Sequence, residues 1–182
     1  MQSKNHDLLT KCKLVNMWNV DESSCFNSQA YKVLVPNKNE HSISSKSAFE
    51  PHITGMFCFN AAGIRLDPFI ILPGLVKNPP ELSQMNAFFC TQSSGWMTRQ
   101  LFAIFCIYFV SKVSAYKEVL PESSEPVVLT VENHSSRIIS YAIEYLAMHN
   151  IALLTFPPHC SHVLQPFDVA AARSLKSSMA KY

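Results

Sequence analysis

Hydrophobic positions in the first part of the chain fall into three short runs that predict β-strands. Residues 14–20 (LVNMWNV) form a β-prone run that stops at the polar segment DESS. Residues 53–60 (ITGMFCFN) and 64–72 (IRLDPFIIL) flank an Ala-Ala-Gly turn, a pattern typical of an antiparallel pair. Pro73 and Gly74 should end the second strand of that pair.

The second half of the chain alternates continuous apolar runs with helical stripes. Residues 127–131 and 151–156 are apolar over nearly their whole length, which favours strands covered on both faces. Between them, apolar residues recur from Ile138 to Leu146 at helical spacing, and Ser135-Ser136 can cap that helix.

Two further helices are expected on the same grounds. Thr98 is a suitable N-cap for a helix whose apolar residues follow from position 101 to 109. A last helix should begin near Asp168. Residues 75–94 show no regular pattern and are predicted to be irregular.

The predicted elements therefore run β, antiparallel β pair, helix, β, helix, β, helix. A strand–helix–strand unit with a short crossover implies parallel pairing. We expect one α/β domain, with a mixed five-stranded sheet that is antiparallel in its first three strands and parallel in the remainder, and helices on both faces. This is the ribonuclease-H-like arrangement. Residues 1–13 are expected to be a frayed tail and residues 14–182 to form the domain.

Composition narrows the class of protein. Apolar residues make up 48% and charged residues 15% of the 182 positions, which suits a packed core and excludes a disordered chain. A net charge of +2 is too small to predict a nucleic-acid partner from the overall field. None of the six cysteines forms a C-x-x-C pair, so reduced thiols are expected. The longest apolar run, residues 101–110, is about half the roughly 20 residues that a membrane span needs, and no membrane partner is expected.

Three acidic residues lie at the ends of predicted strands or at the start of a helix. Asp21 follows the first strand, Glu132 follows VVLTV, and Asp168 opens the last helix. Carboxylates brought together this way repel unless a cation bridges them, and three oxygen donors suit Mg²⁺ or Mn²⁺ better than zinc. From spacing alone the structural interpretation of each acid is the stronger one, because Asp is a good turn former and helix cap.

Other chemistries find less support in the sequence. His134, His159 and His162, with Cys160 nearby, invite a zinc interpretation, but H-x-x-H is tighter than the usual histidine pair and no cysteine pair accompanies it. The chain has no G-x-S-x-G elbow and no P-loop, which argues against a serine hydrolase or a P-loop nucleotidase. Trp96 is most simply a packing residue, and base stacking by it has no support from the sequence.

Five motifs in order resemble the DDE endonuclease domain of pogo and Tigger-type transposases of the mariner superfamily. They are WNVDES (18–23), MFCFNAAG (56–63) with PFIILPG (68–74), SGWMT (94–98), VLTVENHSSR (128–137) and FPPHCSHVLQPFDV (156–169). The group includes domesticated jerky-like and centromere protein B-like relatives. The resemblance spans roughly residues 14–180, nearly the whole chain.

The resemblance implies that Asp21, Glu132 and Asp168 are the catalytic ligands of Mg²⁺ or Mn²⁺ in metal-dependent cleavage and strand transfer of DNA. The family usually has Asp at the second position, where this chain has Glu132. Glu moves the carboxylate outward by about one carbon–carbon bond, a shift that near-octahedral Mg²⁺ tolerates poorly. The alternative is a catalytically impaired, domesticated nucleic-acid-binding or interaction module.

The resemblance also implies supporting residues. It places Asn133, His134, His159 and His162 in active-site loops, where they would orient carboxylates or contact phosphate. Glu22 matches the family motif but should point to the opposite face of its strand from Asp21. Arg173 and Lys176 share a face of the last helix and would hold the DNA backbone, although a solvated helix face explains them equally well.

These implications set the remaining expectations. DNA is the expected partner, a homodimer is compatible with the family, and the protein should be nuclear. Transposases of this group carry helix-turn-helix DNA-binding domains ahead of the catalytic core, and we expect no such domain within this sequence.

Overall fold

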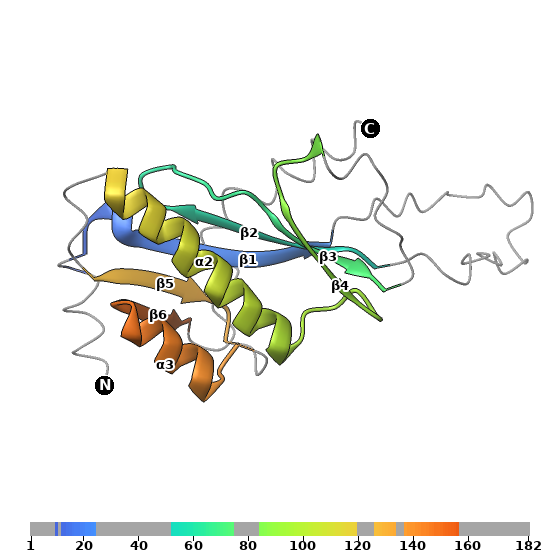
Figure 1. The fold of residues 1–182 in the computed structure, drawn as a ribbon. Coiled ribbons are helices and arrows are strands. Elements are labelled where there is room, and N and C mark those ends of the chain that lie inside the picture. The colour runs from blue at the N-terminus through green and yellow to red at the C-terminus, as the bar shows by residue number, and fades with distance from the viewer. Residues whose placement is uncertain are drawn as a thin grey trace, which may run out of the picture.

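A computed structural model describes residues 10, 12–24, 52–74, 84–119, 126–133 and 137–156. Within them a six-stranded sheet has the order β4-β3-β2-β1-β5-β6 (Figure 1). The strands are β1 (Met17–Ser24), β2 (Thr54–Asn60), β3 (Phe69–Pro73), β4 (Phe88–Gln92), β5 (Val127–Val131) and β6 (Ile151–Thr155). The sheet therefore has one strand more than the five predicted.

Strand directions confirm the predicted mixed sheet. β1, β2 and β3 pair antiparallel, whereas β1 with β5 and β5 with β6 pair parallel. The additional strand, β4, lies at the sheet's edge and pairs parallel with β3. Its residues are exposed or half-buried and do not alternate regularly between the two states, so its sequence lacks the pattern that identifies a strand, and the prediction of irregular structure there was wrong.

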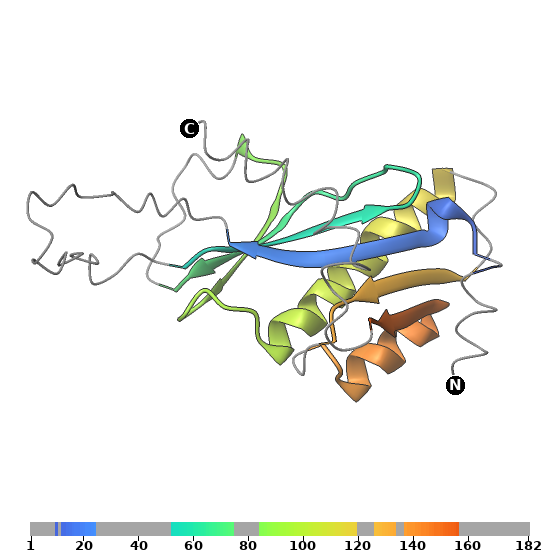
Figure 2. The same cartoon turned by 180° about the vertical axis from the view of Figure 1, so that it is seen from behind.

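The described helices are a short 3₁₀ turn η1 (Leu14–Asn16) and two α-helices, α2 (Arg99–Val119) and α3 (Ser140–Met148). Both α-helices lie on the same face of the sheet, as the two opposite views show (Figures 1 and 2). No described helix is both long and apolar enough to span a membrane. The last predicted helix, near Asp168, lies outside the described residues.

One of the two predicted helix N-caps is found in the structure. The backbone N–H of Leu101 donates to Thr98 Oγ1 at 3.2 Å, which confirms Thr98 as the cap of α2. α3 begins later than predicted, after Ile139, which provides no side-chain cap. Its buried residues are Ala142 and Leu146, whereas Ile143, predicted to lie in the stripe, is 39% exposed.

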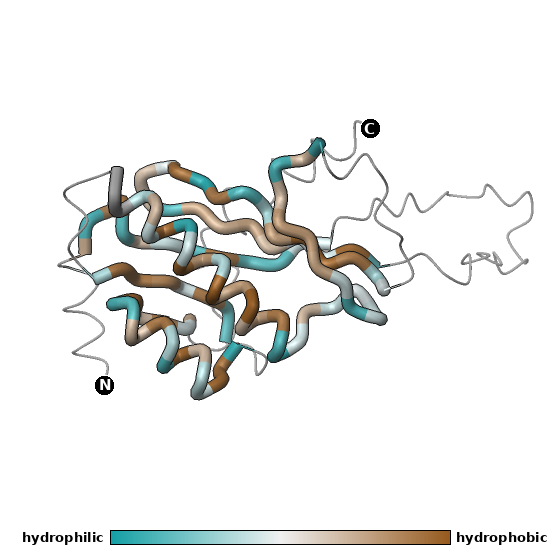
Figure 3. The backbone as a smooth tube through the Cα atoms, in the orientation of Figure 1, coloured by the Kyte–Doolittle hydropathy of each residue, from teal (hydrophilic) through white to brown (hydrophobic). Residues whose placement is uncertain are grey.

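Aromatic residues of α2 form the centre of the core. Phe102, Phe105 and Phe109 have no exposed surface, and Phe109 meets Trp18 of β1 edge-to-face with ring centroids 5.8 Å apart. Hydrophobic residues extend along β5 and much of α2 (Figure 3). This packing holds α2 against β1.

Candidate active site

Asp21 lies within a strand and not after one. β1 is longer than predicted because its pairing with β2 continues from Trp18↔Asn60 to Ser24↔Thr54, which places Asp21 fifth of eight residues. Its exposed fraction is 7%. Alternation along the strand sets Asp21 on the face opposite Trp18, which packs against α2. Asp21 is therefore a buried carboxylate on the face of the sheet away from the described helices.

β1 and β5 are joined by parallel pairing and by side-chain hydrogen bonds. The parallel register aligns Asn19 with Thr130, and Asn19 Nδ2 donates to Thr130 Oγ1 at 3.1 Å. The Thr130 hydroxyl in turn donates to the carbonyl of Trp18 at 3.0 Å. Asp21 lies two residues after Asn19 in β1, and Glu132 directly follows β5, two residues after Thr130. Of the three predicted acids, one thus lies in β1 and another directly after the neighbouring strand β5.

The structure adds a residue that the sequence did not indicate, Arg137. Its Nη2 donates to Glu22 Oε1 at 2.7 Å and its Nη1 to Glu132 Oε2 at 3.3 Å. The arginine side chain is 4% exposed, against 23% for Glu22 and 45% for Glu132. Charge-assisted bonds to two carboxylates compensate the buried guanidinium. The predicted second ligand is therefore already the partner of an arginine.

The sequence contains little signal for this bridge. Arg137 and Glu22 are 115 positions apart, and Glu22 was expected only to point away from Asp21. The one available clue is the arginine that closes the ENHSSR motif, five residues after Glu132.

Of the remaining predicted site residues, the structure describes only Asn133. Asn133 follows Glu132 and is exposed. Asp168, His134, His159, His162, Arg173 and Lys176 lie outside the described residues. Within the described ranges, no three His, Cys, Asp or Glu side chains are grouped so as to hold a metal ion. Asp21 and Glu132 are oxygen donors of the kind that Mg²⁺ and Mn²⁺ prefer, so the donor chemistry fits a hard cation once a third acid joins them.

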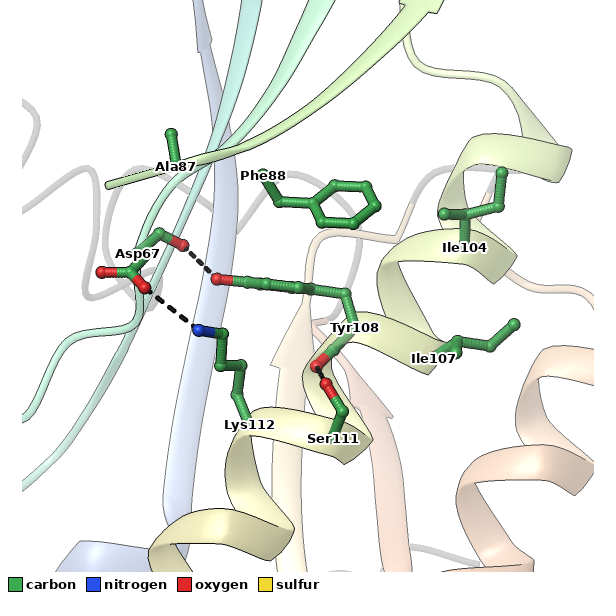
Figure 4. Close-up of a pocket in the computed structure, with 8 residues that line it drawn as sticks. All are labelled: Asp67, Ala87, Phe88, Ile104, Ile107, Tyr108, Ser111 and Lys112. Carbon is green, nitrogen blue, oxygen red and sulfur yellow. Dashed lines mark hydrogen bonds and ion pairs between the residues drawn. The ribbon is translucent and has the colours of Figure 1, made fainter. Parts of the chain in front are cut away.

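A surface pocket of about 380 Å³ lies between α2 and the start of β4 (Figure 4). Phe88, Ile104 and Tyr108 are among the residues that line it, and the Tyr108 hydroxyl donates to the carbonyl of Asp67 at 2.7 Å. Burial, reinforced by the charge of Asp67, raises the pKa of Tyr108 to about 12. Lys112 pairs with the Asp67 carboxylate at 3.1 Å. Because the polar groups of this pocket satisfy one another, it is a weaker candidate for chemistry than the carboxylate site.

The sequence matches the model of a known protein family. The sequence model of the DDE superfamily endonucleases matches residues 50–182, a range that includes Glu132 and Asp168 but starts after Asp21. No curated protein matches the chain.

Solved structures give the same fold. The catalytic domain of Mos1 mariner transposase aligns with a TM-score of 0.62 and 12% identity, covering 100% of this chain and 68% of that one. The same domain with raltegravir and Mn aligns with a TM-score of 0.62 and 13% identity, covering 100% of this chain and 70% of that one. A pre-cleavage Mos1 transpososome aligns with a TM-score of 0.60 and 16% identity, covering 98% of this chain and 46% of that one. Together with the family match, this ribonuclease-H-like fold identifies the chain as a member of the DDE superfamily endonucleases.

Proposed function

We propose that this domain cleaves DNA phosphodiester bonds with the help of a divalent cation and transfers the freed strand end. The observation that carries the proposal is the parallel pairing of β1, which contains buried Asp21, with β5, which Glu132 directly follows, in a DDE endonuclease fold. Solved relatives include a Mos1 catalytic domain with Mn and a Mos1 transpososome. These relatives support Mn²⁺ or Mg²⁺ as the cofactor and DNA as the substrate.

The proposal assigns roles to residues of this chain. Asp21, Glu132 and Asp168 would hold Mg²⁺ or Mn²⁺, which when bound supplies an activated water and stabilises the leaving oxygen. Around these three carboxylates, loop residues would orient ligands or contact phosphate, and the last predicted helix would hold the backbone of DNA. The supporting residues are Asn133, His134, His159, His162, Arg173 and Lys176.

Arg137 favours a second candidate function, a catalytically impaired nucleic-acid-binding or interaction module. Its guanidinium bonds one oxygen of Glu132, so a cation that binds there competes with a buried positive charge. Glu132 also stands where the family usually has Asp. Both features weaken the second ligand position while the fold remains intact.

A nicking assay separates the two candidates. Supercoiled plasmid is incubated with Mg²⁺ or Mn²⁺ and either the native chain or one of three variants, Asp168→Ala, Glu132→Asp and Asp67→Ala. Asp67→Ala is the control, because Asp67 is an exposed carboxylate paired with Lys112 and is not one of the assigned ligands. Native cleavage that Asp168→Ala abolishes and Asp67→Ala preserves supports the nuclease. An inactive native chain that gains strong activity as Glu132→Asp supports the impaired module, and cleavage that persists in Asp168→Ala contradicts the assigned site.

We also propose a nuclear location and a homodimer, both from the family resemblance. Cell fractionation with a tagged chain and light scattering of the purified protein test them separately. A cytosolic, monomeric protein would contradict both without affecting the nuclease assay.

A further inference from the structure

The loop between β4 and α2 presents an exposed tryptophan. Trp96 is 57% exposed, whereas the other tryptophan, Trp18, is 2% exposed. The indole of Trp96 is stacked on the imidazole of His52, with ring centroids 3.7 Å apart and an angle of 15° between the planes. The ring is thus supported from one side while most of its surface stays in water.

The backbone around this stack is built to hold it. Gly95 has a φ of +73°, and a Cβ there would lie 1.7 Å from the carbonyl oxygen of His52, so only glycine permits this approach. Thr54, itself buried, donates from Oγ1 to the carbonyl of Gly95 at 2.8 Å. The N–H of Gly95 closes a turn on the carbonyl of Gln92 at 3.0 Å. The loop is therefore pinned to the start of β2, and the indole is oriented without being buried.

The surroundings of Trp96 favour an anionic ligand. The first turn of α2 contains no acidic residue, and neither does the loop SSGWMT before it. Arg99 begins the helix and is exposed. A helix start has a partial positive charge, which together with an arginine suits a phosphate.

The location of the loop agrees with this chemistry. The hydroxyl of Tyr141 in α3 donates to the carbonyl of Arg99 at 3.4 Å, which links the starts of α2 and α3. Arg137, just before α3, contacts Glu132 at the candidate active site. Figure 1 shows α2 beginning on the side of the molecule toward which β1 and β5 run. The loop that contains Trp96 leads into this start of α2, and Thr54, which bonds its Gly95, pairs with Ser24 at the end of β1.

We propose that Trp96, supported by His52, is a stacking platform for an unpaired nucleobase, with Arg99 and the start of α2 taking the adjacent phosphate. The inference rests on the proposed action on DNA and adds a contact to unpaired bases. A rigid indole stacks on any base, because every base has a π-face, and an already ordered ring loses little freedom on binding.

The test compares an oligothymidylate with an abasic oligonucleotide of equal length, in EDTA at one fixed salt concentration, by fluorescence anisotropy. We expect the native chain to bind the base-bearing strand more tightly. Trp96→Ala should weaken that binding by about 5- to 100-fold and remove the preference for bases, whereas Trp96→Phe should retain most of it. Met85→Ala is the matched control, because Met85 is also 57% exposed and precedes β4 as Trp96 follows it. Thermal unfolding checks that each variant is folded.

Four outcomes overturn the platform. If the Trp96→Ala variant binds both strands as tightly as the native chain does, Trp96 has no role in binding. If Trp96→Ala loses the same affinity for base-bearing and abasic strands, the tryptophan has only a packing role in the loop. If the native chain binds duplex and single strand equally well, unpaired bases are excluded as the ligand. If the native chain cleaves plasmid yet shows no preference for bases, only the platform fails. A native chain that binds no DNA at all contradicts the proposed function itself.

Discussion

Two ion-pair sites in this molecule use the same chemistry in different surroundings. In one, Arg137 binds Glu22 and Glu132 beside the candidate active site. In the other, Lys112 binds Asp67 on the rim of the α2–β4 pocket (Figure 4). The arginine side chain is 4% exposed, whereas the lysine and aspartate side chains are 41% and 47% exposed.

This difference in burial determines what each pair does. An exposed pair contributes about 0–1 kcal/mol, because water screens the charges and both side chains lose freedom. A buried charge that loses its partner is destabilising by about 3–5 kcal/mol, because nothing replaces the lost hydration. We therefore expect the Arg137 bridge to contribute strongly to stability, and a metal ion bound by Glu132 would have to coexist with it. The Lys112 pair is close to dispensable.

The largest predicted effect follows from removing Glu22. Glu22→Ala leaves the Arg137 guanidinium with Glu132 at 3.3 Å as its remaining carboxylate partner among the described residues, and should lower the free energy of unfolding by about 2–4 kcal/mol in urea denaturation. The double variant Glu22→Leu/Arg137→Met should recover most of this loss, since it removes the charge and keeps the volume. A Glu22→Ala variant no less stable than Asp67→Ala would show that burial does not distinguish the two sites.

Most of the fold could be predicted because its core elements have strong local patterns. The apolar runs at β5 and β6 and the cap at Thr98 each depend on neighbouring residues, and each was confirmed. β4 was missed because its half-exposed residues are held by pairing with β3, a contact that local pattern does not encode. The start of α3 was misplaced because a serine pair suggested a cap earlier in the chain.

The candidate site could be predicted only in part. The family resemblance indicated Asp21 and Glu132, and their common role as metal ligands stays a prediction, although their strands β1 and β5 pair in parallel. Arg137 could not be predicted, because the Glu22 that compensates its charge is distant in sequence and the burial of an arginine is a tertiary property. The role of Trp96 was left as packing for the same reason, since its exposure and its stack on His52 depend on the close approach of Gly95.

An intermediate effect that depends on pH is expected at the pocket. Tyr108→Phe removes the hydrogen bond to Asp67 and should cost about 1 kcal/mol at neutral pH. Burial raises the folded-state pKa of Tyr108 to about 12, above the unfolded value of 10.0. The neutral phenol therefore stabilises the fold fully below pH 10, and this contribution is lost as the pH rises to 12. Thermal melts from pH 8 to 12 should show the native chain and Tyr108→Phe converging, and a constant gap would contradict the shifted pKa. The cysteine thiols, common to both proteins, cancel in the comparison.

The smallest effect is expected at the exposed pair itself. Lys112→Ala should change the free energy of unfolding by about 0.5 kcal/mol or less, because Lys112 and Asp67 are both well hydrated without each other. Part of this change comes from the lysine's contact with the face of Tyr108, 5.6 Å from the ring centroid. Lys112→Met keeps the aliphatic chain over the ring and removes the charge, so it separates the two contributions. In urea denaturation at low and high salt, the difference between the native chain and Lys112→Met should shrink with salt, as expected for a screened surface pair. If Lys112→Ala lowered the free energy of unfolding by more than about 2 kcal/mol, the Lys112–Asp67 pair would be as important as the Arg137 bridge. Exposure would then not distinguish the two sites.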